Sequence, residues 1–210
     1  MIERKSIFKS IFEKPWEESQ ILKDNNHDGK ALSMSGSKLG VRYIMLVSTV
    51  IFSLFIVSYS DRMLVHDWKN MPEPWLLWLN TLVLLINSYV FHKTKVFAYE
   101  NDYTKTKKGL FISGLLSYLF LIGQAIVWYL LMKNGYYADA NPANAFFYLF
   151  TALHGLHLMG GLIFWGRTTS KLLKSDNKLE NLQHSIELCA VYWHFLLIIW
   201  LVLFGLMLFT

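Results

Sequence analysis

Four ionisable side chains lie within long apolar stretches of the sequence: His154, His157, Glu187 and His194. An ionisable group is costly in hydrocarbon, so each is expected to face protein or water if its stretch crosses a membrane. A histidine in such a place could exchange protons, ligate a metal or haem, or form hydrogen bonds between helices. The spacing of the three histidines helps to choose among these uses.

The histidine spacing argues against a haem or metal site. His154 and His157 are three residues apart and share one face of a helix, so they cannot approach a haem from opposite sides. A zinc site takes three or four ligands, and His194 is the only obvious third. The sequence also has no glycine-rich phosphate loop, CxxC pair, nucleophile triad or paired carboxylate. Hydrogen bonding between helices is therefore favoured, and we expect no catalytic residue, metal or cofactor in this chain.

The elements that position these residues are predicted to be membrane-spanning helices. Of the 210 residues, 54% are hydrophobic, and the charges cluster between long uncharged blocks. A spanning helix needs about 20 residues, and lipid tolerates only helices or closed barrels. No strand alternation competes. The sequence therefore predicts an all-α integral membrane bundle of five transmembrane helices, at about 41–59, 75–91, 109–132, 143–165 and 186–209.

The first 40 residues are predicted to form a cytoplasmic polar segment. A possible interfacial helix ends before Pro15, with apolar residues on one face and basic residues nearby. If the five blocks cross the membrane, 17 of the 20 Lys and Arg residues lie on the same side as the N-terminus. The positive-inside rule then places the N-terminus in the cytoplasm and the C-terminus on the periplasmic side. The net charge of +5 is attributed to these flanks, and no nucleic-acid partner is expected.

Depth along the helices predicts a polar layer. His157 and His194 each lie roughly 12 Å from the cytoplasmic end of their blocks, at about 1.5 Å per residue. Thr49 and Tyr118 reach nearly the same depth. We expect these four residues to meet in the cytoplasmic half of the bundle, where they could handle protons or contact lipid.

Glu187 and several uncharged residues have structural interpretations. Glu187 falls at the start of the fifth block, where a helix-end acid could pair with a basic residue of the preceding loop, hold a lipid headgroup or handle protons. Polar and small residues within spans commonly join helices. The predicted helix-packing residues are Asn80, Gln124, Gly155, Gly160 and Gly161.

Two stretches in the second half of the chain carry a family resemblance. NPANAFFYLFTALHGLHLMGGLIFWG, followed by IELCAVYWHFLLIIWLVLFGLML, resembles subunit III of haem-copper terminal oxidases in its five-span bacterial form. PEPWLLWLNTLVLLINS and the region of Gln124 and Trp128 agree, so the resemblance covers roughly residues 41–209. The matching signature positions in the last two blocks are His154, His157, Glu187, Trp193 and His194.

The resemblance implies an accessory subunit without redox centres, in the inner membrane of a bacterial cell. Haem and copper would lie in the partner catalytic subunit I, with subunit II as a second expected partner. The subunit would stabilise the catalytic subunit, bind phospholipids in a cleft between helices and support proton uptake during the reduction of oxygen to water. A cytochrome c oxidase is favoured over a quinol oxidase.

One position departs from the family pattern. Where the family often reads Ser-Glu in the first span, this chain reads Ser48-Thr49. A threonine cannot ionise, and Thr49 is expected to hydrogen bond to a carbonyl of its own helix or of a neighbour. Three alternatives stay open: an accessory subunit of a nitric oxide reductase, a stand-alone transporter or proton channel, and a small membrane cytochrome.

Overall fold

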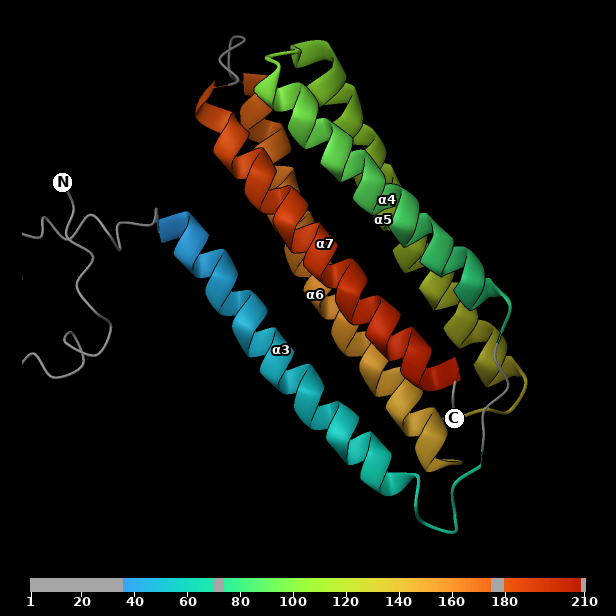
Figure 1. Ribbon diagram of the computed structural model, residues 1–210. Helices are drawn as coiled ribbons and strands as arrows, with labels where there is room; N and C mark the ends of the chain where they lie inside the picture. The colour runs from blue at the N-terminus through green and yellow to red at the C-terminus, as the bar shows by residue number, and fades with distance from the viewer. Residues whose placement is uncertain (1–35, 70–73, 175–179, 209–210) are drawn as a thin grey trace, which may run out of the picture. The chain divides into compact units, whose positions relative to one another are not determined.

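The computed structural model describes residues 36–69, 74–174 and 180–208, and within these ranges every regular element is an α-helix (Figure 1). The chain separates into two units after Gly40, and the fold described here is that of the second, Val41–Thr210. The possible interfacial helix before Pro15 lies outside the described residues. The helices are α3 (Gly36–Arg62), α4 (Leu76–Tyr99), α5 (Tyr103–Lys133), α6 (Pro142–Lys174) and α7 (Glu180–Leu208).

Four of the five helices are long and apolar enough to cross a membrane, namely α3, α5, α6 and α7. The predicted all-helical class therefore agrees with the described part of the chain. Helix α4 has 24 residues, so its length suffices, but Asn80, Asn87 and His92 dilute its apolar sequence. Its passage through the membrane stays a prediction.

The helices extend beyond the predicted apolar blocks because the loss of hydropathy does not end a helix. Helix α4 continues through the charged residues after position 91 and ends at Tyr99. The chain then turns at Asn101, which has a φ of 58°. The side chain of Asp102 accepts a hydrogen bond from the backbone N–H of Lys105 at 3.0 Å and so caps the start of α5.

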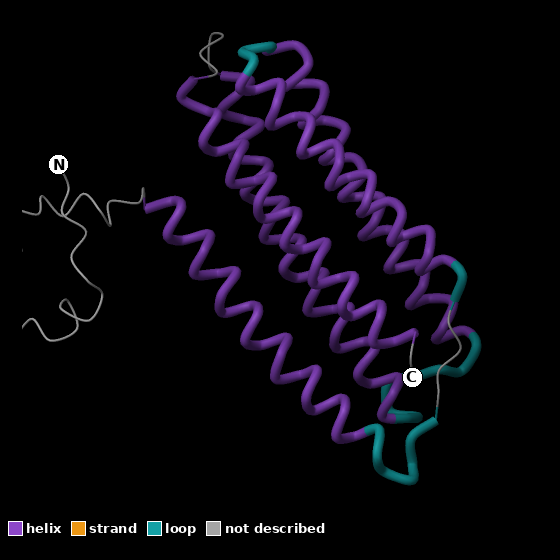
Figure 2. The backbone as a smooth tube through the Cα atoms, in the orientation of Figure 1, coloured by secondary structure: helices purple, strands orange, loops and turns teal. Residues whose placement is uncertain are grey.

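Helices α4, α5, α6 and α7 form a closed four-helix ring, in which α4 packs on α5 and α7, and α6 packs on the same two helices (Figure 2). Large buried side chains such as Phe91, Phe120 and Leu158 fill its core. Glycine permits a close approach where α4 crosses α5, because a Cβ added to Gly123 would lie 2.2 Å from Oδ1 of Asn80. This ring positions most of the polar residues described below.

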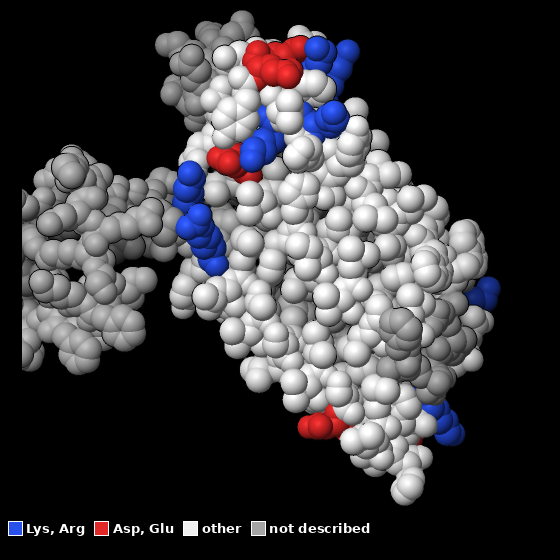
Figure 3. All heavy atoms as spheres, viewed as in Figure 1, with Lys and Arg blue, Asp and Glu red and all other residues white. Residues whose placement is uncertain are grey.

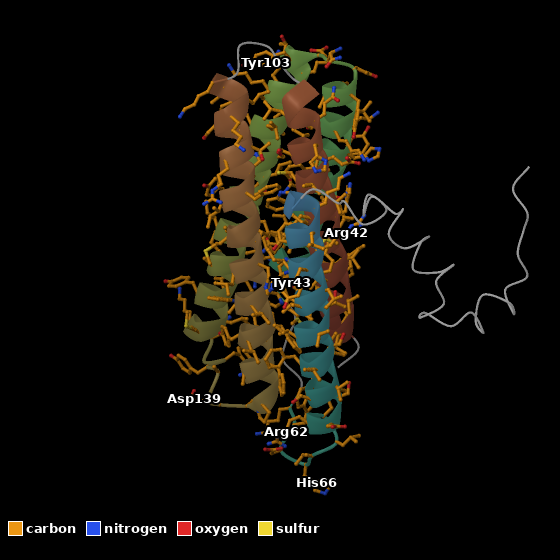
Figure 4. The ribbon with its side chains drawn as sticks, turned by 90° about the vertical axis from the view of Figure 1, so that its left-hand side faces the viewer. Arg42, Tyr43, Arg62, His66, Tyr103 and Asp139 are labelled. Carbon is orange, nitrogen blue, oxygen red and sulfur yellow. The ribbon has the colours of Figure 1, made fainter. Side chains whose placement is uncertain are left out.

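Helix α3 lies beside the ring (Figure 1). Within the described residues none of its Cα atoms comes within 8 Å of another helix, so its contacts are made by long side chains. The rings of Phe52 and His157 are 5.4 Å apart, and Tyr59 packs on Phe146 and Phe150 at 5.4 and 5.7 Å. Figure 4 places Arg62, the last residue of α3, and His66, which follows it, at the opposite end of the bundle from Tyr103.

The Asp102 cap gives a first testable prediction, Asp102→Ala. The hydrogen bond from the Lys105 backbone and the nearby Lys105 ammonium hold the pKa of the Asp102 carboxyl below its ordinary value. Its stabilising effect is therefore present above the ordinary carboxyl pKa of about 3.9 and is lost as the pH falls below it. In detergent, we expect Asp102→Ala to have a lower thermal midpoint than the parent at pH 7.

The difference between the two midpoints should narrow toward pH 3. Asp102→Asn is the matched control, because it keeps the capping oxygen and removes the titration. An equal deficit of Asp102→Ala at both pH values would contradict the assignment of this cap.

Candidate functional site

His157 and His194 reach similar depths but lie against different helices, so the predicted single polar layer is wrong. His157 lies on the side of α6 that faces α3, and its Nδ1–H donates to the carbonyl of Leu153 at 2.8 Å. His194 lies on the side of α7 that faces α4, where its Nδ1 hydrogen bonds to Oγ of Ser88. Depth fixes the position of a residue along a helix and leaves open the face on which it lies.

Thr49 and Tyr118 do not join the histidines either. The hydroxyl of Thr49 donates to the carbonyl of Met45, one turn earlier in its own helix, at 2.8 Å. Tyr118 is on α5 and is 51% exposed. No described contact connects the two residues with each other.

The contact between α4 and α7 carries a file of polar side chains, which we call the α4–α7 seam: Ser88, His92, Lys95, Tyr99, Glu187 and His194. The rings of His92 and His194 are 6.1 Å apart. Glu187 forms an ion pair with Lys95 at 3.1 Å and accepts a hydrogen bond from the hydroxyl of Tyr99, also at 3.1 Å. All but Ser88 are at least partly exposed, so the file is accessible from outside the ring.

Glu187 therefore differs from its predicted setting. Helix α7 begins at Glu180, so Glu187 lies about two turns inside it, and it forms an ion pair with Lys95 of α4. His92 is a residue of the seam that sequence reasoning missed. It follows Ser88 by four residues and precedes Lys95 by three, and this helical spacing places all three on one face.

His154 and Trp193 are core residues. His154 is fully buried between Phe120 and Trp200, with ring centroids at 5.8 and 5.2 Å. Trp193 is 3% exposed and stacks on Phe91 at 5.0 Å. Among the described residues there is no group of three or more His, Cys, Asp or Glu side chains that could hold a metal ion.

The predicted packing residues have unequal roles. The amide of Asn80 donates to that of Gln124 at 3.4 Å, and both side chains are buried. A Cβ on Gly161 would lie 2.9 Å from the ring of Tyr192, so Gly161 allows α6 to approach α7. Gly155 would make only an ordinary contact, and Gly160 would meet nothing within 4 Å, so the prediction that Gly160 serves packing is wrong.

An apolar groove of about 370 Å³ lies between α3, α6 and α7, and we call it the α3 groove. Its walls include Val41 and Ile44 of α3 and Ile163 of α6, and His157 and Arg167 of α6 contribute polar groups. On the face drawn in Figure 3, charged side chains gather toward the two ends of the bundle and leave an uncharged band between them. The α3 groove therefore combines apolar walls with one cationic side chain, that of Arg167.

The sequence matches the family described as cytochrome c oxidase subunit III over residues 16–210. The chain belongs to the cytochrome c oxidase subunit III family. Its similarity to cytochrome c oxidase subunit 3 of Synechocystis is 26% identity, covering 78% of this chain and 71% of the relative. Subunit 3 of Thermostichus vulcanus is 28% identical, covering 80% of this chain and 85% of the relative. The probable subunit 3 of Nocardia farcinica is 29% identical, covering 77% and 82%.

Membership in the subunit III family makes this chain an accessory component of a multi-subunit oxidase. Together with its four long apolar helices, membership also indicates a multi-pass membrane protein. Membership in the subunit III family is also consistent with the expectation that this chain carries no cofactor of its own. Within the described residues, the α3 groove and the α4–α7 seam are two surfaces that bring polar groups together at the outside of the ring.

Proposed function

We propose that this subunit III stabilises the catalytic subunit of a respiratory oxidase, binds phospholipid and supports proton uptake while the complex reduces oxygen to water. Haem and copper would reside in subunit I, with subunit II as its neighbour and cytochrome c, in place of a quinol, as the electron donor. The observation that carries the lipid-binding part of the proposal is the α3 groove. Its apolar walls and single arginine match the two chemical halves of a phospholipid.

The groove suits an acyl chain because aliphatic side chains from two helices form its walls. Arg167 offers a guanidinium group, which binds phosphate oxygens with two parallel hydrogen bonds. Among the described residues, helix α3 makes no close backbone contact with the ring, and the α3 groove leaves about 370 Å³ between them that a lipid chain can enter. A bound lipid would then join α3 to α6 and α7.

The proposed topology has five crossings in a bacterial inner membrane, with a cytoplasmic N-terminus and a periplasmic C-terminus. Helix α4 supports this count, because its 24 residues span about 36 Å, more than the roughly 30 Å hydrocarbon core. Its neighbours α5 and α7 cover its buried amides Asn80 and Asn87. The excess of Lys and Arg on the N-terminal side supports the orientation.

Position 49 is a threonine and has no carboxylate, so proton uptake would use other titratable groups of this chain. His157 borders the α3 groove, and the α4–α7 seam aligns His92, His194 and Glu187. Imidazoles and carboxylates at a membrane surface can accept protons and pass them on. These groups would pass protons to a neighbouring subunit, which would carry out the reduction of oxygen.

Co-purification from the native membrane tests the proposed function. We expect this chain to purify in mild detergent with subunits that give a haem spectrum and consume oxygen. Nitric oxide reduction without oxygen consumption would favour the reductase alternative instead. A Soret band or a proton flux in liposomes from the isolated chain would favour the small cytochrome or the channel.

A second prediction concerns lipid retention by the α3 groove. Arg167→Gln should weaken the retention of anionic phospholipid by about tenfold, because a charge-assisted hydrogen bond contributes about 1.5–3 kcal/mol. Native mass spectrometry of the complex measures the bound lipid. Lys171→Gln is the matched control, since Lys171 is exposed on the same helix and does not line the groove. Equal lipid loss in both variants would argue against binding at the α3 groove.

A further inference from the structure

Helix α7 carries a half-buried histidine near the middle of its apolar length. The part of α7 that is long and apolar enough to cross a membrane runs from Leu182 to Leu208. At about 1.5 Å per residue, His194 lies roughly 18 Å from one end of this part and roughly 21 Å from the other. The hydrocarbon core extends about 15 Å on either side of its centre, so the imidazole lies deep within it.

The α4–α7 seam adds further polar groups around this histidine. The buried hydroxyl of Ser88 lies at the same depth, because it hydrogen bonds to Nδ1 of His194. His92, one helical turn further along α4, is exposed, and its ring is 6.1 Å from that of His194. The ion pair of Lys95 with Glu187 continues the file toward the start of α7. The outer side of the seam is therefore polar within an apolar span.

Lipid is a poor cover for such a surface, because acyl chains form no hydrogen bonds and polar groups within spans face protein or water. Helix α3 does not provide the cover, since it packs on another side of α7. Leu203 belongs to the buried cluster that contains Phe52 and Tyr59 of α3. It follows His194 by nine residues, which places it about 180° around the helix. We therefore expect another chain to cover the seam.

Exposed apolar side chains flank the polar file, as in a face that packs against a helix. On α7, Val191 and Ile198 are exposed and lie three residues before and four residues after His194. On α4, the exposed Leu85 precedes His92 by seven residues. Spacings of three, four and seven keep these side chains on one face of each helix, so a third helix can lie along the seam.

The hydrogen bonding of the seam selects the kind of partner. Ser88 has no other acceptor among the described residues, so its O–H donates to Nδ1 of His194. A neutral imidazole then carries its proton on Nε2, which is a donor. A second copy of this chain, in the same membrane orientation, would bring another donor to that depth. A complementary helix would instead bring a carbonyl, hydroxyl or carboxylate oxygen.

We propose that a transmembrane helix of another oxidase subunit packs along the α4–α7 seam and presents a hydrogen-bond acceptor to Nε2 of His194. This inference rests on the proposed stabilisation of the catalytic subunit and names the face that provides it. It uses neither the lipid bound in the α3 groove nor the uptake of protons. The docked helix removes the polar side of the seam from contact with lipid.

Photo-crosslinking in the intact oxidase complex tests the docking face. A photoreactive amino acid replaces Ile198 beside the seam or, as the control, Ile122 on α5. The two isoleucines are 59% and 58% exposed, and α5 lies across the ring from α7. We expect a crosslink to another subunit from position 198, identified by mass spectrometry, and its loss at position 122. Equal yields at both positions, or products at 198 with only lipid or a second copy, would overturn the proposal.

A pair of variants tests the hydrogen bond. His194→Gln keeps an N–H near the position of Nε2, whereas His194→Leu removes it, and both remove the ring. After detergent washing, the complex should retain about tenfold more of the Gln variant than of the Leu variant, because one hydrogen bond contributes about that factor. Equal retention of the two variants contradicts the proposed acceptor. If no haem-containing subunit co-purifies with the unmodified chain, the proposed function itself fails.

Discussion

When the oxidase is purified with the His194→Ala variant of this subunit, the complex should retain about tenfold less of the subunit. The haem absorbance of the complex should stay unchanged. His194 is the partner of the buried Ser88 hydroxyl and lies beside His92 in the α4–α7 seam. Removing the imidazole leaves that hydroxyl unpaired and withdraws a polar group from the exposed side of the seam. Losing such a pair costs about 1–3 kcal/mol, and about 1.4 kcal/mol corresponds to tenfold.

The ratio of this subunit to the catalytic subunit, measured by quantitative mass spectrometry after detergent washing, checks the expectation. His66→Ala is the control, because His66 is exposed in the connection between α3 and α4 (Figure 4). Full retention of the His194→Ala subunit would show that the seam does not hold the complex together. A changed haem spectrum would instead assign the histidine to a redox centre.

A large loss of stability is expected from Gly114→Ala. The indole of Trp165 on α6 donates to the carbonyl of Leu110 at 2.9 Å and lies across α5 at Gly114. A Cβ on Gly114 would lie 2.1 Å from that ring, so the indole would have to leave its position. Overpacking of this kind costs about 3 kcal/mol, which lowers the thermal midpoint by about 10 °C in a chain of this size.

Gly160→Ala is the matched control for this effect. Gly160 meets nothing within 4 Å, so alanine there should keep or raise stability through its higher helix propensity. The thermal midpoints of both variants can be followed by tryptophan fluorescence in detergent. Similar midpoints would mean that Trp165 adapts without loss and that α5 and α6 do not need their close approach.

The sequence predicted the helices but not the faces on which their residues lie. Uncharged blocks located α3, α5, α6 and α7, because hydrophobic length is a direct requirement of the bilayer. The depths of His157 and His194 were similar, yet one residue faces α3 and the other faces α4. Their directions depend on which helices form the ring, and only tertiary packing reveals that α3 lies outside it.

The glycines also show that the sequence does not reveal which face of a helix packs against a neighbour. Gly160 and Gly161 attract attention as a pair, but only Gly161 lies against a neighbouring helix. Gly114 and Gly123 of α5 are not paired with another glycine in the sequence, yet they permit close approaches of side chains from α6 and α4.

Helix α4 has a consequence for biogenesis in the proposed topology. Two asparagines lower its apolarity, and its buried amides find partners on α5, where Asn80 pairs with Gln124 and Asn87 with Ser117. During synthesis, α4 would leave the translocation channel together with α5 as a hairpin, since lipid alone would not retain it. The ring would then stay open on one side until α7, which follows α6 in the chain, arrives against α4.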